Sequence, residues 1–277
     1  MLRLNPRLAP AVVVAAALVA GVAVSQWVAA ARERAAARAI RQALLDDLQP
    51  VALSNCRLAR FGSPYDGGYL MCENLIEGLE TAYSYGVGPN DDWGCDVSRR
   101  YQVPVHQYDC FDPARPACDG GTFVFHDACI ADRPFVRESR VFDTLQNQIA
   151  ANGDTGRRMI VKMDVEGAEW DSLLATPDEV LDAIDQMPME LHGADGRRFL
   201  EGVRKLKRTF FVVNVHFNNW SCNEELEPMP AWAYQVLLVN KRLGQVDGSV
   251  EPPAASSPLN APDFPDSPDC QAWPSGR

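Results

Sequence analysis

Basic residues are scarce in this 277-residue sequence, which has 26 Lys and Arg against 37 Asp and Glu and a net charge of −11. Binding to a nucleic-acid backbone needs a basic surface, so the charge balance argues against nucleic acid as the main partner. A small anionic cofactor is not excluded, because backbone amides can bind one without a basic side chain. The sequence also has no internal repeat, and its 47% hydrophobic and 23% charged residues are ordinary for a globular protein.

Cysteine pairs with the C-x-x-C spacing of zinc ribbons are also lacking. The sequence has an even number of cysteines, spread widely: Cys56, Cys72, Cys95, Cys110, Cys118, Cys129, Cys222 and Cys270. Two interpretations stay open. The cysteines form disulfides if the domain is exported, or they are buried free thiols with one or two at the surface.

Charged residues are absent between Arg7 and Arg32, where residues 11–31 are almost wholly Ala, Val, Leu and Gly. This run is long enough to cross a bilayer, so residues 1–31 are predicted to be a single-pass N-terminal transmembrane anchor. A signal peptide cleaved near Ala29–Ala31, with export of the rest, is the alternative. The basic residues on the two sides of the run favour a cytoplasmic domain if the segment is an anchor.

The rest of the chain divides into three parts by composition. Residues 32–50 have a helical pattern and are predicted to form a stalk, and residues 51–243 form the folded domain. Residues 244–277 hold seven prolines between Pro252 and Pro274 among small and acidic residues. This tail is predicted to be disordered, because it has little apolar surface to bury.

Strand-like and helical segments alternate through the folded domain, which predicts an α/β fold with a mainly parallel sheet covered on both faces. Ligands of such sheets bind beyond the carboxyl ends of the strands. The expected strands are Thr81–Tyr85, Val103–Tyr108, Thr122–Phe125, Met159–Met163, Met187–Leu191, Phe210–His216 and Tyr234–Asn240. The expected helices are Asp92–Tyr101, Phe142–Asn152, Pro177–Asp185 and Arg197–Arg208, the third begun by a capping box of Thr176 and Glu179.

Two glycines, Gly86 and Gly88, follow the first expected strand and precede a helix. They let the backbone turn tightly and approach a ligand, although a Gly-x-Gly pair is also common in plain turns. The third glycine of the dinucleotide fingerprint is missing and Pro89 removes an amide, which argues against an NAD-type site. Asp109 and Asp112, about 20 residues further on, are candidates to bind ribose hydroxyls, or they belong to a simple strand-end turn.

Carboxylates and histidines follow three later strands. Asp164 stands at a strand tip, where sites of α/β proteins are built, while Glu169 is expected to be solvated surface charge. His192 and His216 end two further strands. A lone histidine is more often structural, but two at one rim make each a candidate general base.

These motifs together resemble the FkbM-type methyltransferases and related methyltransferase-like proteins. The resemblance covers roughly residues 61–240 and is carried, in order, by Asp66-Gly67-Gly68-Tyr69, Tyr85-Gly86-Val87-Gly88, Phe111-Asp112-Pro113, Lys162-Met163-Asp164-Val165-Glu166-Gly167-Ala168-Glu169-Trp170 and Glu190-Leu191-His192. It implies a Rossmann-like, doubly wound, seven-stranded sheet of the class I methyltransferase type that ends in an antiparallel hairpin. The implied cofactor is S-adenosyl-L-methionine.

The resemblance also implies roles for single residues. Gly86 and Gly88 would pass under the methionine and ribose of the cofactor, Asp112 would bind the ribose hydroxyls, and Asp164 would face the sulfonium. One departure is that Ser84 or Tyr85 stands where the family has an acid at the start of the glycine motif.

The expected activity is O-methylation of an unidentified small-molecule or glycan-like acceptor. Methyl transfer from a sulfonium mainly requires positioning of the partners, with a proton acceptor near the acceptor hydroxyl. His192 or His216 is expected to fill that role, with Asp164 or Glu166 as the orienting group, and no metal ligand is assigned. Two alternatives stay open: a membrane-tethered, non-catalytic cofactor-binding module, or a metal-dependent hydrolase built from Asp164, Glu166, His192 and His216.

Overall fold

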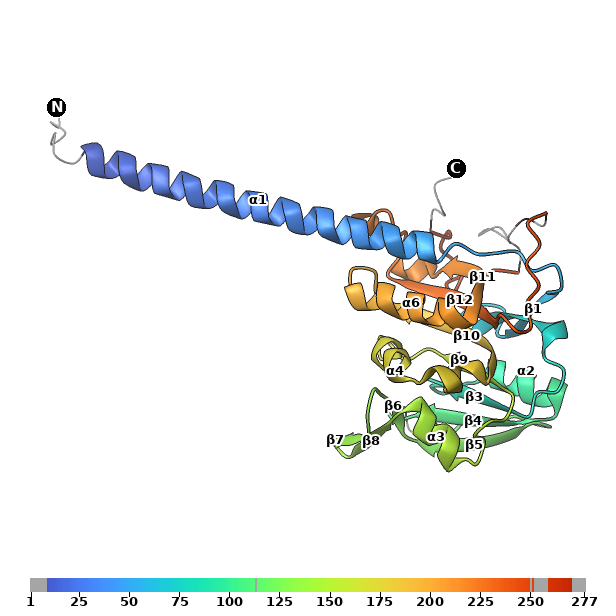
Figure 1. Cartoon of the computed structure of the whole chain (residues 1–277). Helices are drawn as coiled ribbons and strands as arrows, with labels where there is room; N and C mark the ends of the chain where they lie inside the picture. The colour runs from blue at the N-terminus through green and yellow to red at the C-terminus, as the bar shows by residue number, and fades with distance from the viewer. Residues whose placement is uncertain (1–8, 113, 250, 252–258, 271–277) are drawn as a thin grey trace.

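A computed structural model describes residues 9–112, 114–249, 251 and 259–270, with side chains from residue 24 onward. It is a mixed α/β fold around a seven-stranded mixed sheet (Figure 1). The strands of this sheet are β3 (Thr81–Tyr85), β4 (Pro104–Asp109), β5 (Thr122–Asp127), β9 (Met159–Met163), β10 (Ile184–His192), β11 (Phe210–Phe217) and β12 (Ala233–Asn240). The helices are α1 (Ala9–Asp47), α2 (Asp92–Tyr101), α3 (Leu145–Ala151), α4 (Glu169–Ala175), α5 (Asp178–Asp182) and α6 (Arg197–Thr209).

The strand order is β11-β12-β10-β9-β3-β4-β5. Strands β10, β9, β3, β4 and β5 run parallel, and β12 is antiparallel to both of its neighbours, β10 and β11. The chain starts the sheet at β3, adds β4 and β5 on one side, and then returns to place β9 on the other side. The order therefore reverses between β3 and β9, and such a switch point is where open α/β sheets bind ligands.

Each face of the sheet has its own apolar core, because side chains alternate along buried strands. In β9, Met159, Val161 and Met163 pack into one core with the last turns of α1 and with α3, α4, α5 and α6. Ile160 points to the other core, which contains α2 and the hairpin β1 (Leu58–Gly62) and β2 (Gly68–Cys72). Figure 1 shows these two sets of elements on opposite sides of the sheet.

All seven predicted strands overlap strands of the central sheet, and four predicted helices overlap α2, α3, α5 and α6. The predicted helix Phe142–Asn152 begins later, because its start belongs to β8 (Arg140–Asp143), which forms a small second sheet with β6 (Cys129–Ile130) and β7 (Phe135–Arg137). The predicted capping box is wrong: the Thr176 hydroxyl donates to the Ser172 carbonyl instead. The hairpin β1–β2 and helix α4 were not predicted.

The cysteines are paired in four disulfides, which decides between the two interpretations left open by the sequence. The pairs are Cys56–Cys72, Cys95–Cys118, Cys110–Cys129 and Cys222–Cys270. Disulfides of this number are typical of proteins that fold in an oxidising compartment.

The prediction of an N-terminal transmembrane helix is wrong, and so is the single-pass membrane localisation that rested on it. Among the described residues, no helix is long and apolar enough to cross a membrane. The described side chains of α1 include Arg32, Glu33, Arg34 and Arg38, and the last turns of this helix pack into the domain core instead. Side chains of residues 1–23, which make up most of the apolar run, lie outside the described part of the chain.

The tail also differs from its predicted disorder where the structure describes it. Asn260 and Asp263 are buried, and their side chains exchange hydrogen bonds with Asn214 and Gln235 of the sheet. The Cys222–Cys270 disulfide ties the far end of this segment to the loop after β11. Residues 250, 252–258 and 271–277 of the predicted tail lie outside the described residues.

Removing the Cys222–Cys270 disulfide is expected to detach this segment. The bond closes 48 residues, so the double Ser variant should lose about 4 kcal/mol of unfolding free energy in urea titrations. Limited proteolysis should then cut within residues 259–270. A Cys95→Ser, Cys118→Ser variant is the comparator, because it loses a disulfide without loosening the tail. Equal resistance of this segment in both variants would contradict the expectation.

Candidate functional site

A cleft of about 390 Å³ opens at the carboxyl ends of β9 and β10, beside the switch point of the sheet. Polar and acidic side chains from distant parts of the chain line it together with three large aromatic ones. The lining residues are Asp66, Asp164, Glu166, Glu190, His192, Asn218, Trp220, Trp232, Ala233, Asp263 and Phe264. Five of these are carboxylates, so an acceptor with hydroxyl groups or a cation fits the chemistry of this cleft better than an anion does.

Asp164, directly after β9, is held by one side chain of β2 and one of β9 itself. The Tyr69 hydroxyl donates to Asp164 Oδ2 at 2.9 Å, and Lys162 Nζ lies 3.7 Å from the same oxygen. Lys162 also donates to the carbonyls of Tyr85 and Gly86, so it ties Asp164 to the end of β3. The second carboxylate oxygen, Oδ1, is left to face His192 Nε2 at 3.9 Å.

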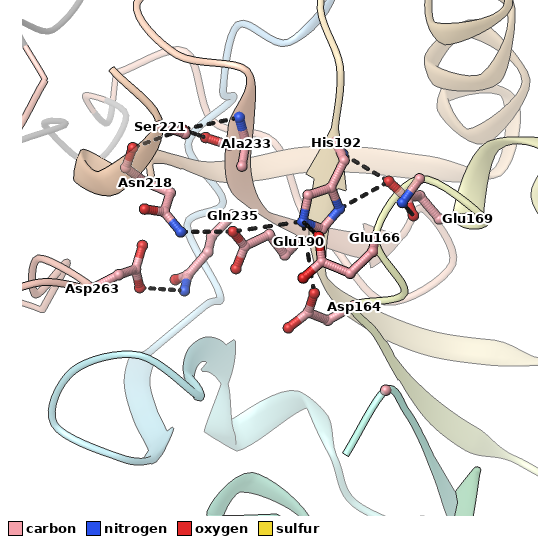
Figure 2. A network of polar contacts seen from close by, with 12 residues as sticks. Asp164, Glu166, Glu169, Glu190, His192, Asn218, Ser221, Ala233, Gln235 and Asp263 are labelled. Carbon is pink, nitrogen blue, oxygen red and sulfur yellow. Dashed lines mark hydrogen bonds and ion pairs between the residues drawn. The ribbon is translucent and has the colours of Figure 1, made fainter. Parts of the chain in front are cut away.

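His192 ends β10 and is held from behind by Glu169. One oxygen of Glu169 accepts hydrogen bonds from the His192 amide at 2.7 Å and from Nδ1 at 3.1 Å. Nε2 then points to Asp164 and to Glu166 Oε2, 3.5 Å away (Figure 2). The expectation that Glu169 is solvated surface charge is wrong, because its side chain is 0% exposed.

The carboxylates around His192 decide its protonation state. Burial lowers the pKa of His192, but the hydrogen bond and charge of Glu169, followed by the charges of Asp164 and Glu190, outweigh burial and raise this pKa to about 9. At neutral pH the imidazole therefore carries a proton. In this state it is a positively charged orienting group, which differs from the general base that the sequence predicted.

Two more acids of the cleft are held in buried positions. Burial raises the pKa of Glu190 to about 8, and the charges of Asp164 and Asp263 add to the rise. Burial, followed by the charge of Asp66, raises the pKa of Asp263 to about 7. Asn218 donates to Glu190 Oε1 and Gln235 donates to Asp263 Oδ1 (Figure 2). The buried Asp263 Oδ2 has no hydrogen-bond partner in the part of the chain that the structure describes.

The structure does not bring His216, the other predicted base, into this cleft. Its side chain is buried on β11, it is not among the lining residues, and Nε2 lies 3.3 Å from Asp269 Oδ1. Burial lowers the pKa of His216, so this histidine is expected to be neutral and structural.

The glycine turn after β3 presses directly on the end of β9. Gly86 has φ +71°, and a Cβ on it would meet the Asp164 carbonyl oxygen at 1.7 Å, so only glycine fits there. The Gly86 amide donates to the Tyr108 carbonyl of β4, and the Gly88 amide donates to Asp109 Oδ2. The turn therefore joins the carboxyl ends of three neighbouring strands.

The two candidate ribose acids behave differently. The Asp109 carboxylate accepts hydrogen bonds from the amides of Gly88, Phe111 and Asp112, so it already serves the turn. Asp112 Oδ1 accepts one hydrogen bond, from the Ala114 amide. Gly86, Gly88 and Asp112 do not line the cleft, and Asp164 alone connects the expected cofactor residues with it.

Several residues of this site were not assigned a role from the sequence. Tyr69, Lys162 and Glu190 lie within quoted motifs. For Glu190 the end of a predicted strand was an available signal, whereas Tyr69 lies in the unpredicted hairpin and Lys162 lies within an apolar strand. Asp263 lies in the proline-rich tail, where no sequence pattern places it beside β12.

Comparisons with known proteins leave the family unassigned. No protein-family model matches the chain, and no curated protein matches it. The chain is similar to the crystal structure of Thermoplasma acidophilum 1320, with 16% sequence identity over 73% of this chain and 98% of that chain and a TM-score of 0.33. A likeness at this level carries no argument about function, so the resemblance to FkbM-type methyltransferases stays a prediction.

Gly86 and Gly88 form a matched pair for a stability test. Gly86→Ala is expected to cost roughly 2–5 kcal/mol, because the added Cβ overlaps the Asp164 backbone at a positive φ. Gly88→Ala should cost about 1 kcal/mol, because its φ is also positive but nothing lies within 4 Å of the added Cβ. Urea unfolding of both variants measures the difference, and equal losses would show that the turn does not press on β9.

The raised pKa of Glu190 predicts a pH-dependent stability difference. A pKa of about 8 in the folded protein lies above the ordinary value of 4.5. The contribution of Glu190 to the free energy of unfolding is therefore fully present below pH 4.5 and is lost as the pH rises through 8. Glu190→Gln retains an oxygen for Asn218 and cannot ionise, so this variant should gain stability relative to the parent between pH 5 and 8. Glu201→Gln makes the same change at an exposed position and is the control; a constant difference for Glu190→Gln would contradict the prediction.

Proposed function

We propose that this protein is an S-adenosyl-L-methionine-dependent methyltransferase that acts on an oxygen of a small-molecule or glycan-like acceptor. One observation carries the proposal. At the switch point of the sheet, the Gly86 turn at the end of β3 lies directly against Asp164 at the end of β9. This arrangement gives a half-buried backbone turn and a carboxylate at the place where open α/β sheets bind nucleotide-like ligands.

The sheet order and the motif order support the same conclusion. The glycine turn follows β3, the candidate ribose acids follow β4, and Asp164 follows β9, and these three strands are neighbours. The antiparallel strand β12 at the other side of β10 agrees with the hairpin that the family resemblance implies. The chain thus has each expected motif at the carboxyl edge of the expected strand.

In this proposal the cofactor lies along the ends of β3 and β4. A Cβ at Gly88 would meet none of the described atoms within 4 Å, which leaves room for a ligand above this residue in the described part of the chain. Asp112 would accept the ribose hydroxyls, since Asp109 is already engaged with backbone amides. The Asp164 carboxylate would then face the positively charged sulfonium, and its negative charge would favour the bound cofactor.

The acceptor would occupy the acidic cleft on the other side of Asp164. Trp220 and Trp232 line this cleft and are 72% and 40% exposed, so their rings offer apolar faces for a sugar-like or planar acceptor. Protonated His192 would donate a hydrogen bond to an acceptor oxygen and hold it in line with the methyl group. The proton that the acceptor loses would pass to a carboxylate of the cleft, with the exposed Glu166 in reach.

The four-residue metal-dependent hydrolase is not supported, because His216 lies outside the cleft. A non-catalytic cofactor-binding module differs from the proposal only in turnover. It would bind the cofactor and transfer no methyl group.

Calorimetry of the full chain with S-adenosyl-L-methionine tests the cofactor before any acceptor is known. We expect one molecule bound per chain. Asp112→Ala should weaken binding tenfold or more, because charge-assisted hydrogen bonds to ribose are worth about 1.5–3 kcal/mol. Asp119→Ala removes an exposed carboxylate of the same loop and is the control. Absence of binding heat in the parent would overturn the proposal, and equal affinity in Asp112→Ala would remove this residue from the site.

A further inference from the structure

We infer that the cleft binds one divalent metal ion through Asp164 Oδ1, Glu166 Oε2 and His192 Nε2. The ligand atoms of these three side chains all lie within 4.8 Å of one another. Two carboxylates and one imidazole form a mixed oxygen and nitrogen set that suits a first-row divalent metal such as Mn²⁺ or Zn²⁺. Figure 2 shows the three side chains converging from the ends of β9 and β10.

The distances are close to those of a formed site. His192 Nε2 lies 3.5 Å from Glu166 Oε2 and 3.9 Å from Asp164 Oδ1. At metal–ligand distances of about 2.0–2.2 Å, neighbouring ligand atoms are about 3 Å apart. All three atoms lie within 4.8 Å of one another, so shifts of up to about 2 Å would bring them around one ion, and side-chain rotation of the exposed Glu166 can supply much of this movement.

Two of the three ligands, His192 and Asp164, are already held in place through the atoms that face away from the ion. Glu169 accepts the hydrogen bond from His192 Nδ1, which leaves Nε2 as the atom that faces the cleft. Metal-binding histidines almost always have such a carboxylate or carbonyl behind them. Tyr69 and Lys162 hold Asp164 Oδ2, which leaves Oδ1 for the ion. Glu169 and Tyr69 are therefore positioning residues in this proposal.

A separate observation in the same cleft also points to a cation. Asp263 is 8% exposed and lines the cleft, and among the described residues its buried Oδ2 atom has no hydrogen-bond partner. A buried carboxylate oxygen without a partner is costly, and a bound cation, directly or through its water ligands, would satisfy it. Asp66 lines the same cleft and adds to the negative potential that attracts a cation.

The backbone keeps Glu166 beside the other two ligands. Its φ is +54°, which non-glycine residues rarely adopt, and Gly167 follows with φ +99°. This turn places an 84% exposed side chain next to His192, which is only 9% exposed. The ion would replace the proton on Nε2 as the positive charge among these carboxylates.

The role of the ion in methyl transfer, but not its binding, rests on the proposed function. Three protein ligands leave coordination positions open towards the cleft, where an acceptor hydroxyl would bind. A metal ion lowers the pKa of an oxygen bound to it. With the ion in place, the metal would hold the acceptor oxygen instead of protonated His192, and the proton of the hydroxyl would pass to a carboxylate of the cleft that does not bind the ion.

Electron paramagnetic resonance of the chelator-treated full chain tests the site with Mn²⁺ alone. During the titration, the signal of free Mn²⁺ should appear only after one ion per chain has been added. The bound ion should show ¹⁴N coupling from His192. Mn²⁺ that stays free, or bound Mn²⁺ without nitrogen coupling, would overturn the assignment.

Variants locate the ion at these residues. Glu166→Gln changes an exposed side chain, so the fold should survive, and Mn²⁺ binding should weaken at least tenfold. Glu169→Gln should weaken it 10–100-fold by releasing His192. Glu201→Gln, an exposed control on α6, should bind as the parent does. Equal loss in Glu166→Gln and Glu201→Gln would mean only non-specific attraction and would overturn the site.

The metal proposal and the proposed function fail separately. The Mn²⁺ titration contains no S-adenosyl-L-methionine, and the cofactor calorimetry contains no metal. Metal binding without cofactor binding would overturn the methyltransferase alone, whereas cofactor binding without metal binding would overturn the metal site alone.

Discussion

The close approach of Gly86 to Asp164 is the constraint on which the rest of the site depends. With no side chain at Gly86, the end of β3 can lie against the backbone after β9. Lys162 then reaches the carbonyls of Tyr85 and Gly86 and stands beside the Asp164 carboxylate. One backbone contact thus sets the distance between the expected cofactor side of the sheet and the acidic cleft.

The cleft concentrates negative charge by placing acids on different elements around one histidine. Glu169 begins α4, Glu190 lies in β10, and Asp164 and Glu166 follow β9. His192 is within 4.0 Å of all four. Because the imidazole is the common neighbour, the net charge of the cleft depends on what its Nε2 atom holds, whether a proton or an ion.

Most strands of the sheet were predictable because they are buried on both faces and therefore appear as apolar runs, as in Met159–Met163; the edge strand β5 is the exception. Asp164 and His192 were predictable as neighbours for the same reason, since carboxyl ends of parallel strands meet at one edge. The burial of Glu169 was not predictable, because its side chain points into the protein from the first turn of α4, a helix that was not predicted from the sequence. The position of Asp263 depends on tail contacts across the fold. The membrane span was predicted wrongly because the prediction used composition alone. Composition does not reveal that the last turns of α1 pack against the domain.

Asp263 and Phe264 form one wall of the cleft and follow the last strand of the sheet in the sequence, which ends at Asn240. Chains generally fold from the N-terminus as they are synthesised. The sheet and its histidine can therefore assemble before the segment that encloses them has been made. The cleft therefore gains this wall only after the core of the sheet can already have formed.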